Sequence, residues 1–346
     1  MKITKIQKAA MTVIGENGDQ MGEGFFSFHS TARGYNHINN DKVCEDSSDS
    51  YDEEELHICV VADGHGSDNY PRTDKGSDFA VRSAIECIQE FVSENTPEEL
   101  VKDDGNILLK QLSEKILIKW NELVKEDYEK HPFIEDELVN VSEKYRQLYL
   151  SENDEKKAKK AYGTTLISYV VWKGCSFGLQ IGDGKCVVVE RDASFREPIP
   201  WDDECTFNIT TSICDDNAAE EFRFYVSGTV PAAVFCGSDG IDDSYTGMEE
   251  VYALYRSMLT ILGEHGKEVF EKETEEYLPV LSKKGSGDDV SVSAIIDHER
   301  TEIIAPVLKL QAEMFKLENE LEKKRQQLII KTGELRKETN GSKDLR

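Results

Sequence analysis

The sequence lacks features that would assign the chain to several large classes of protein. No apolar run approaches the roughly 20 residues that a membrane-spanning helix needs. Residues 1–10 are basic and polar, without the apolar segment of a signal peptide. The eight cysteines include no Cys-x-x-Cys pair, and several lie inside apolar runs, as reduced core thiols do. We therefore expect a cytoplasmic protein with reduced thiols and no membrane partner.

Positive charge is scarce relative to negative charge. The chain has 41 lysines and arginines against 68 aspartates and glutamates, which gives a formal net charge of -27. A surface of this sign repels a phosphate backbone, so we expect no nucleic-acid partner. The charge is explained most simply by solubility, and an acidic interaction surface is the alternative.

The hydrophobic pattern changes period along the chain. Helical spacing predicts helices over residues 75–95, 107–128, 133–149 and 251–276. Alternating or continuous apolar runs predict strands over residues 25–31, 57–62, 164–172, 175–181, 186–190, 222–226, 232–237 and 290–296, with one more around 10–14. Short turns at 173–174 and 182–184 suggest antiparallel hairpins, and the acidic tract 47–55 a solvated hairpin tip. Grouped helices and hairpin-linked strands predict the α+β class, two sheets covered by helices.

The C-terminal segment differs from the rest. Five residues share one heptad position: Val307, Met314, Leu321, Leu328 and Leu335. Leu310 and Leu317 continue a second position, which Lys324 and Lys331 then interrupt. This spacing predicts a coiled-coil-like helix over 301–337. It could mediate a homodimer, bind a partner helix or fold back on the domain, and we divide the chain into a domain at 1–300 and a helical extension at 301–346.

Acidic residues follow apolar strands in a recurring pattern, usually beside glycine. The segments are Cys44-Glu45-Asp46, Asp63-Gly64, Gly182-Asp183-Gly184, Ser238-Asp239-Gly240 and Gly287-Asp288-Asp289. One such acid alone is better explained by a turn or a cap. Several carboxylates gathered at strand ends would repel one another strongly unless a cation is present. Oxygen ligands without paired histidines or thiolates suit Mg²⁺ or Mn²⁺ rather than zinc, and two such ions can activate a water and hold phosphoryl oxygens.

These motifs carry a resemblance to a known family. Asp63-Gly64-His65-Gly66, Gly163-Thr164-Thr165, Gly182-Asp183-Gly184, Ser238-Asp239-Gly240 and Asp288-Asp289-Val290-Ser291-Val292 occur in the order and approximate spacing of the PP2C-type metal-dependent serine/threonine phosphatases. The match covers residues 25–296, and residues 211–214 with 222–224 look most like the bacterial branch. The resemblance implies an α/β/β/α sandwich and hydrolysis of phosphoserine or phosphothreonine in a phosphoprotein by a metal-bridging hydroxide.

The resemblance also implies a role for each matching residue. Asp63 would bridge two Mn²⁺ or Mg²⁺ ions, and the Gly64 carbonyl would ligate one of them. The other implied metal-site residues are Asp239, Asp288, Glu45, Asp46 and, for a third and weaker ion, Asp183, with Asp243 beside Asp239. His65 would be the general acid for the departing serine or threonine oxygen, a task that suits the pKa of imidazole. The alternative for His65 is a loop histidine bonded to a neighbouring carboxylate.

The chain departs from the family pattern where the substrate phosphate is gripped. Many members have an arginine shortly before the Glu-Asp pair, whereas here Arg33 lies further upstream and His37 is nearer the expected place. We assign phosphate binding to His37 and Arg33. Because this cation is displaced, a catalytically weak regulatory module on the same fold, acting through its acidic surface and C-terminal helix, is the alternative function.

Overall fold

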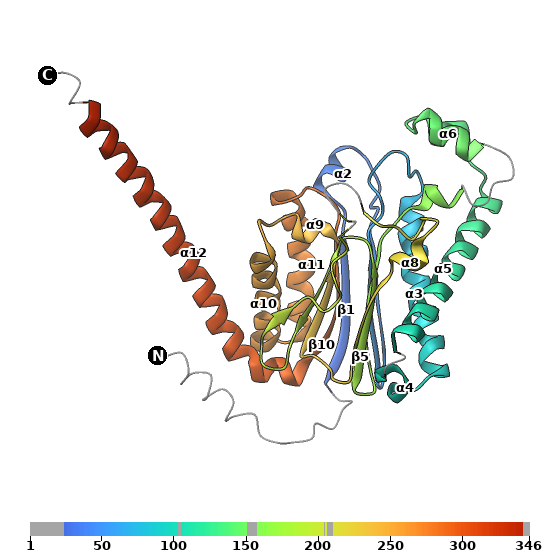
Figure 1. Cartoon of the computed structure of the whole chain (residues 1–346), viewed down its shortest axis with the longest axis horizontal. Helices are drawn as coiled ribbons and strands as arrows, with labels where there is room; N and C mark the ends of the chain where they lie inside the picture. The colour runs from blue at the N-terminus through green and yellow to red at the C-terminus, as the bar shows by residue number, and fades with distance from the viewer. Residues whose placement is uncertain (1–23, 103–104, 151–157, 204, 206–209, 342–346) are drawn as a thin grey trace.

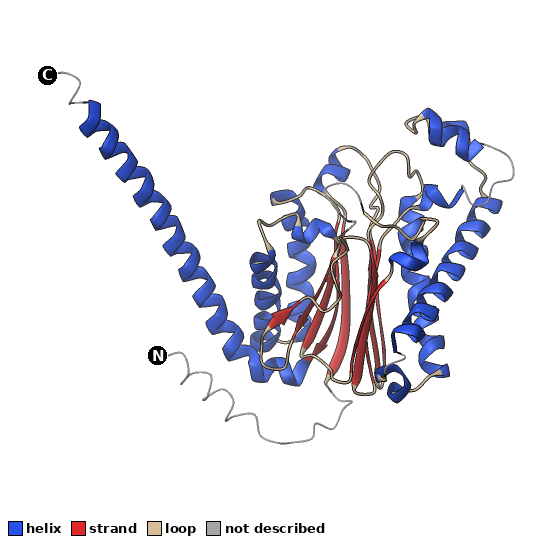
Figure 2. Ribbon diagram, viewed as in Figure 1, coloured by secondary structure: helices blue, strands red, loops and turns tan. Residues whose placement is uncertain are grey.

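Two five-stranded antiparallel sheets pack face to face in the computed structural model (Figures 1 and 2). The structure describes residues 24–102, 105–150, 158–203, 205 and 210–341, with the backbone alone for 334–341. One sheet has the order β1-β10-β9-β6-β7 and the other β2-β3-β4-β5-β8. The first comprises β1 (Phe25–Ala32), β10 (Val290–Asp297), β9 (Ala233–Gly237), β6 (Lys185–Val189) and β7 (Phe195–Arg196). The second comprises β2 (Ser47–Glu53), β3 (Leu56–Ala62), β4 (Leu166–Trp172), β5 (Cys175–Ile181) and β8 (Arg223–Ser227).

Helices cover the outer face of each sheet, as Figure 1 shows. The sheet that contains β3 is covered by α3 (Thr73–Glu94) and α5 (Gly105–Lys130). The other sheet is covered by α10 (Met248–His265) and α11 (Lys267–Lys284). The shorter helices are α2 (Tyr35–Asn39), α4 (Pro97–Val101), α6 (Glu143–Leu150), α8 (Ala218–Glu221) and α9 (Asp239–Asp242), with 3₁₀ turns η1 (Glu135–Leu138) and η2 (Lys159–Tyr162). The α+β prediction of two helix-covered sheets is confirmed.

Three apolar layers hold the sandwich together, one under each helical layer and one between the sheets. The layer between the sheets is built mainly from β-branched residues and thiols, together with Tyr169, and Cys59 Sγ lies 3.6 Å from Cys236 Sγ. All eight cysteines are free, and all but Cys44 are buried. Small side chains suit this position because two stacked sheets lie only about 10 Å apart. In the described part of the chain, no helix combines the length and apolar character needed to cross a bilayer.

The acidic tract was predicted correctly only at its end. Glu54 and Glu55 form an exposed hairpin turn, whereas residues 47–53 form β2, which pairs along its whole length with β3. As an edge strand, β2 can keep polar side chains half-exposed while its backbone completes the sheet. Asp52 accepts hydrogen bonds from the Ser27 N–H and from His57 Nδ1, at 2.9 and 2.7 Å. These bonds give a strand-forming role to an acid that the composition assigned to a loop.

The hairpin predicted at 182–184 is also wrong, because the chain crosses from one sheet to the other there. β5 pairs with β4 and β8, whereas β6 pairs with β9 and β7. The helix predicted over 251–276 is divided at Gly266, whose φ of 82° ends α10, and the following helix continues to Lys284. The helix predicted over 133–149 is instead η1 followed by α6. The strand expected around 10–14 lies outside the described residues.

The C-terminal helix α12 (His298–Gly341) begins on the domain and then leaves it (Figure 1). Thr301, Ile304 and Leu308 are buried, and the first turns pack against α10. Further along, Leu310, Met314, Leu317, Leu321 and Leu328 are each at least 50% exposed. The side chain of Leu335 lies outside the described residues. The fold-back interpretation therefore holds for the first turns alone, and the heptad stripe faces outward.

Candidate metal centre

The acidic motifs meet at one edge of the sandwich. β3 ends at Ala62 opposite the start of β2, and Gly237 at the end of β9 lies opposite Val292 near the start of β10. Leu166 at the start of β4 likewise pairs with Ile181 at the end of β5. Antiparallel pairing thus brings the acids that follow β3, β5 and β9 to the same edge as those that precede β2 and β10. The sheet register explains why strand ends far apart in sequence carry the same residue type.

The backbone at Asp63 is fixed by the Gly163-Thr164-Thr165 motif. The Asp63 N–H donates to Thr165 Oγ1 at 3.0 Å, and its carbonyl accepts from the Thr165 N–H and Thr164 Oγ1 at 2.8 and 2.9 Å. Gly64 lies so close to the preceding loop that a Cβ there would be 2.4 Å from the Glu45 carbonyl oxygen. The side chain of Asp63 is therefore presented on a rigid support, and the neighbouring position accepts only glycine without a shift of the backbone.

The carboxylates strongly perturb one another. Burial, followed by the charges of Asp46 and Asp239, raises the pKa of Asp63 well above its ordinary value. Burial also raises the pKa of Asp239 to about 6 against the hydrogen bond from Asp63, and the charges of Asp183, Asp243 and Asp288 add to the increase. The predicted ligands therefore act on one another electrostatically, as the members of one cluster do.

The second pair of acids is buried with oxygens that have no donor. Burial raises the pKa of Asp46 to about 8, and the nearby charge of Asp289 raises it further. Burial likewise raises the pKa of Glu45 to about 7. Glu45 Oε2 and Asp46 Oδ2 have no hydrogen-bond partner. Orphaned carboxylate oxygens in a like-charged cluster fit a divalent cation, which would ionise the acids and satisfy the oxygens.

His65 lies beside this cluster and is bonded to a hydroxyl. Its Nε2 is 2.8 Å from Ser212 Oγ, which donates in turn to the Thr164 carbonyl at 3.1 Å. The ring meets Tyr70 edge-on at 4.7 Å between centroids. Burial lowers the pKa of His65 to about 4, although Asp183 opposes this shift, so the imidazole is neutral at pH 7. The partner is thus Ser212, whereas the alternative interpretation of His65 named a carboxylate.

His37 belongs to the framework of the cluster. Its Nδ1 is 3.0 Å from Asp289 Oδ1, and its Nε2 is 3.5 Å from Asp288 Oδ1 and 3.8 Å from Glu45 Oε2. The bond to Asp289 raises the pKa of His37, with burial opposing the increase. His37 is buried, whereas Arg33, the other residue assigned to phosphate, is exposed. His37, Asp288 and Asp289 also have ligand atoms within 4.8 Å of one another, but the charge of His37 is directed at the two acids.

Two contributors were missed by reasoning from the sequence. Asp289 accepts the backbone N–H groups of Gly34 and Glu45 at 2.5 and 2.6 Å, so it fixes the loop that carries Glu45. Ser212 positions His65. The signal for Asp289 was available as the second acid of the Asp-Asp pair, whereas a serine in a Thr-Thr-Ser run gives no comparable signal.

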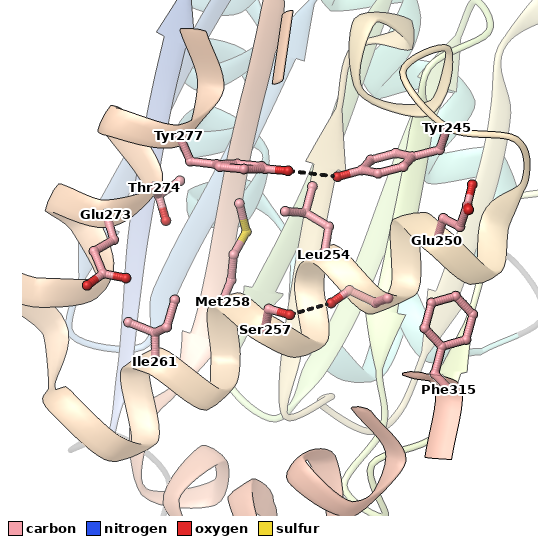
Figure 3. A pocket seen from close by; sticks show the side chains of 11 residues that line it. Tyr245, Glu250, Leu254, Ser257, Met258, Ile261, Glu273, Thr274, Tyr277 and Phe315 are labelled. Carbon is pink, nitrogen blue, oxygen red and sulfur yellow. Dashed lines mark hydrogen bonds between the residues drawn. The ribbon is translucent and has the colours of Figure 1, made fainter. Parts of the chain in front are cut away.

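A separate hollow of about 490 Å³ lies in the outer helical layer. It is lined by α10 and α11, with Phe315 of α12 at its margin, and the Tyr245 and Tyr277 hydroxyls are 3.3 Å apart across it (Figure 3). The lining is mainly apolar and comes from helices rather than from the strand ends. The chemistry suggested by the acids therefore belongs to the sandwich edge.

A comparison with family profiles decides the family. Residues 33–278 match protein phosphatase 2C. The chain belongs to this family. The profile covers His65, the loop at Gly182 and the acids from Glu45 to Asp239, but ends before Asp288 and α12.

Solved structures with the same architecture include several bacterial phosphatases. PppA, a regulatory component of the type VI secretion system in Pseudomonas aeruginosa, is 16% identical over 80% of this chain and 98% of its own, with a TM-score of 0.49. The catalytic domain of PstP in complex with two manganese ions is 15% identical over 79% and 98%, with a TM-score of 0.46. Stp1 from Staphylococcus aureus is 16% identical over 82% and 99%, with a TM-score of 0.46. A comparison with curated proteins gave no match.

Proposed function

We propose that this PP2C-family domain hydrolyses phosphoserine or phosphothreonine in a protein substrate. The observation that supports this most directly is the convergence of like-charged carboxylates from both sheets around Asp63, with raised pKa values and orphaned oxygens. Such a cluster is costly without cations and is suited to hold two of them. Family membership gives the reaction class, and the cluster provides the site for it.

The acids divide into ligands and supports in this proposal. Asp63, the Gly64 carbonyl, Asp239, Asp288 and Glu45 would hold two Mn²⁺ or Mg²⁺ ions, with Asp183 at a third site. When bound, these ions supply an activated water and neutralise phosphoryl oxygens. Asp46 lies near Ser238, Ser291 and Asp289, so it would orient the neighbouring ligands.

His65 would deliver the proton to the departing oxygen of the serine or threonine. Its imidazole is neutral in the free protein at pH 7, since burial lowers its pKa to about 4. An arriving phosphate dianion stabilises the imidazolium form, so substrate binding would raise this pKa and bring a proton onto the ring. The hydrogen bond to Ser212 fixes Nε2, which leaves Nδ1 as the atom that takes up the added proton.

Phosphate recognition falls to Arg33 in this arrangement. His37 is occupied by Asp288 and Asp289, whereas Arg33 is exposed and adjoins Gly34, where a Cβ would lie 2.5 Å from the Asp288 backbone. We retain His37 as a residue that sets the charge of this loop. Arg33→Ala should raise KM for a phosphopeptide more than it lowers kcat.

The experiment is a phosphopeptide assay with added Mn²⁺, repeated with p-nitrophenyl phosphate. Release of phosphate should stop in EDTA and return when Mn²⁺ is restored. Asp63→Asn and Asp239→Asn should each remove activity, while Arg196→Ala, on a surface strand, should leave it unchanged. Activity that persists in EDTA or survives both substitutions would exclude this mechanism.

The second candidate is a regulatory module of low activity on the same fold. It is favoured by the placement of His37, because the cation nearest the expected phosphate site is already paired with acids. Calorimetry separates the two functions. Stoichiometric Mn²⁺ binding without turnover on any phosphopeptide would support the regulatory module.

A further inference from the structure

The turn that carries Asp183 is held at both peptide groups of the preceding glycine. The Gly182 N–H donates to Thr211 Oγ1 at 3.0 Å. The Gly182 carbonyl accepts from Arg223 Nη2 at 2.5 Å and from Gln180 Nε2 at 3.2 Å. Gly182 has a φ of 102°, in the left-handed region that favours glycine. Its unusual conformation is thus fixed by Gln180 of β5, by Thr211 from the segment after β7 and by Arg223 at the start of β8.

Asp202 ties the two outer side chains together. Thr211 Oγ1 donates to Asp202 Oδ2 at 2.8 Å, and Arg223 Nε lies 3.8 Å from the same oxygen. Arg223 Nη1 also donates to the Pro200 carbonyl at 3.1 Å. Thr211 and Asp202 are buried, and the Arg223 side chain is only 13% exposed. We call Asp202, Thr211 and Arg223 the Gly182 clamp.

The clamp includes a buried charge, and the desolvation of that charge opposes folding. Burial lowers the pKa of Arg223, and Asp202, its nearest counter-charge, is at 3.8 Å rather than in hydrogen-bond contact. Nη1 and Nη2 of Arg223 instead donate to the backbone carbonyls of Pro200 and Gly182. A buried cation placed to hold a turn, with little return from an ion pair, is more than packing requires.

The residue that the turn presents is a member of the acid cluster. Asp183 lies close enough to the cluster for its charge to raise the pKa values of Asp63, Asp239 and Asp243. The turn cannot move freely toward β9, because a Cβ at Gly184 would lie 2.6 Å from the Gly237 carbonyl oxygen. The position of Asp183 relative to Asp239 is therefore determined by how Gly182 is held.

We propose that Asp202, Thr211 and Arg223 are positioning residues that orient Asp183 toward a divalent cation. This inference rests on the proposed metal centre. Partners that orient a metal ligand typically contribute about 10–100-fold to metal affinity. The neighbouring Ser212 holds His65 through a 2.8 Å hydrogen bond, so the same short segment also fixes the proposed proton donor.

The test measures Mn²⁺ binding on the full chain by calorimetry and electron paramagnetic resonance. Asp183→Ala should remove the weakest Mn²⁺ site, and the site that is lost is thereby identified as the one that contains Asp183. Thr211→Val keeps the volume of the side chain but loses the hydroxyl, and it should weaken that site about 10–100-fold while leaving the tighter sites unchanged. Thr211→Ser should restore it, and Arg223→Gln provides an independent variant should the valine protein fail to fold. Arg196→Ala is the matched control, since Arg196 contacts Glu190 and Tyr225 instead of Gly182.

The double variant distinguishes positioning from general stability. In the Asp183→Ala background, Thr211→Val should leave Mn²⁺ binding unchanged if the clamp acts through Asp183. Equal Mn²⁺ affinity in wild type, Thr211→Val and Arg223→Gln would overturn the proposal, as would a wild-type protein without any Asp183-dependent site. The proposed function is tested separately by turnover of a phosphopeptide. A protein that binds Mn²⁺ without such turnover would contradict the proposed function, but its Mn²⁺ affinities would still test the clamp.

Discussion

Two groups of charged side chains differ in how their charges are balanced. Under the helices, Arg72 donates to both carboxylate oxygens of Glu137 at 2.6 and 2.9 Å and to the Tyr162 hydroxyl at 2.7 Å. Tyr162 then donates to Asp127, which also accepts from Lys75. At the sandwich edge, Asp46, Asp63 and Asp239 have one another as neighbours. The first group is balanced by cations of the chain itself, whereas no cation among the described residues forms an ion pair with Asp46, Asp63 or Asp239.

The pKa values of Asp127 and Asp63, one from each group, are shifted in opposite directions. Bonds from Tyr162, Lys75 and His131 outweigh burial and lower the pKa of Asp127. Burial and like charges raise the pKa of Asp63. Ionised Asp127 therefore stabilises the folded state, whereas ionising Asp63 in the metal-free protein opposes it. The penalty on ionised Asp63 can be relieved by a proton or by a cation from outside, and this contrast with Asp127 can be measured.

The largest effect is expected from Asp63→Asn. Mn²⁺ at 100 times its dissociation constant should stabilise the wild type by about 2.7 kcal/mol, and the variant should lose this gain. Without metal, the variant should instead be more stable than the wild type. The folded-state pKa of Asp63 is raised, so at pH 7 its ionisation penalises folding, and an amide that can still bond Asp239 removes that penalty. Melting curves with Mn²⁺ and with EDTA check both signs.

Two results would break the comparison at this point. One is an Asp63→Asn protein that still gains stability from Mn²⁺. The other is a metal-free variant that melts well below metal-free wild type, since this would show that Asp63 is balanced within the chain. Glu126→Gln, at an exposed surface pair with Lys130, serves as a control for the loss of a carboxylate.

Asp127→Asn should produce the opposite result. It leaves Lys75 and Tyr162 without their charged acceptor, which should cost about 2 kcal/mol at pH 7 with or without Mn²⁺. The folded-state pKa of Asp127 is lowered, so its contribution is present above the unfolded value of 3.8 and is lost as the pH falls through the folded pKa. Urea unfolding at pH 7 and near pH 3.5 checks this. A cost that does not shrink at the lower pH would contradict the assigned role.

Asp289→Asn sharpens the comparison because Asp289 lies at the acidic edge yet is paired. His37 and the N–H groups of Gly34 and Glu45 outweigh burial and lower its pKa. It should therefore follow Asp127 rather than Asp63 and destabilise the metal-free protein, by about 1 kcal/mol because the amide keeps one acceptor oxygen. Differential scanning calorimetry in EDTA tests this. A rise in melting temperature would place Asp289 with the unbalanced acids.

Sequence pattern predicted the strands well because each is marked by its own residues. β3 and β4 are buried throughout, so their apolar runs are continuous, and β1 has its aromatic residues in the buried first half and polar residues in the more exposed second half. β2 was missed because Ser47–Glu53 contains one aromatic residue and no aliphatic one, and its strand state comes from pairing with β3. The turn at Gly182 was misassigned for a similar reason, since a short glycine turn looks the same whether the chain reverses or crosses to another sheet.

The site divides along the same line. Asp63, Asp183 and Asp239 were predictable because each follows an apolar strand directly, and register then brings them together. The neutral state of His65 was not predictable. It depends on burial of the ring against Tyr70 and against Gly163, which is distant in sequence and has no side chain. The pairing of His37 with Asp289 spans the whole domain. The local sequence pattern thus predicts which acids belong to the site, whereas the protonation state of each group depends on its neighbours in three dimensions.

The smallest effect on stability is expected from removing the outer part of α12. We propose that the domain extends through Phe315, because Ile304 and Leu308 pack on α10 whereas side chains 316–332 are exposed. Truncation after Lys316 touches neither charged group, so the free energy of unfolding should change by less than about 0.5 kcal/mol and p-nitrophenyl phosphate hydrolysis should persist. The stripe of Leu317, Leu321 and Leu328 should instead determine association. The truncated protein should therefore show a lower apparent mass in light scattering or lose the capture of a partner in a binding assay. Leu317→Glu in the full chain should reproduce that change, and an unaltered mass and capture in both proteins would exclude the stripe as an interface.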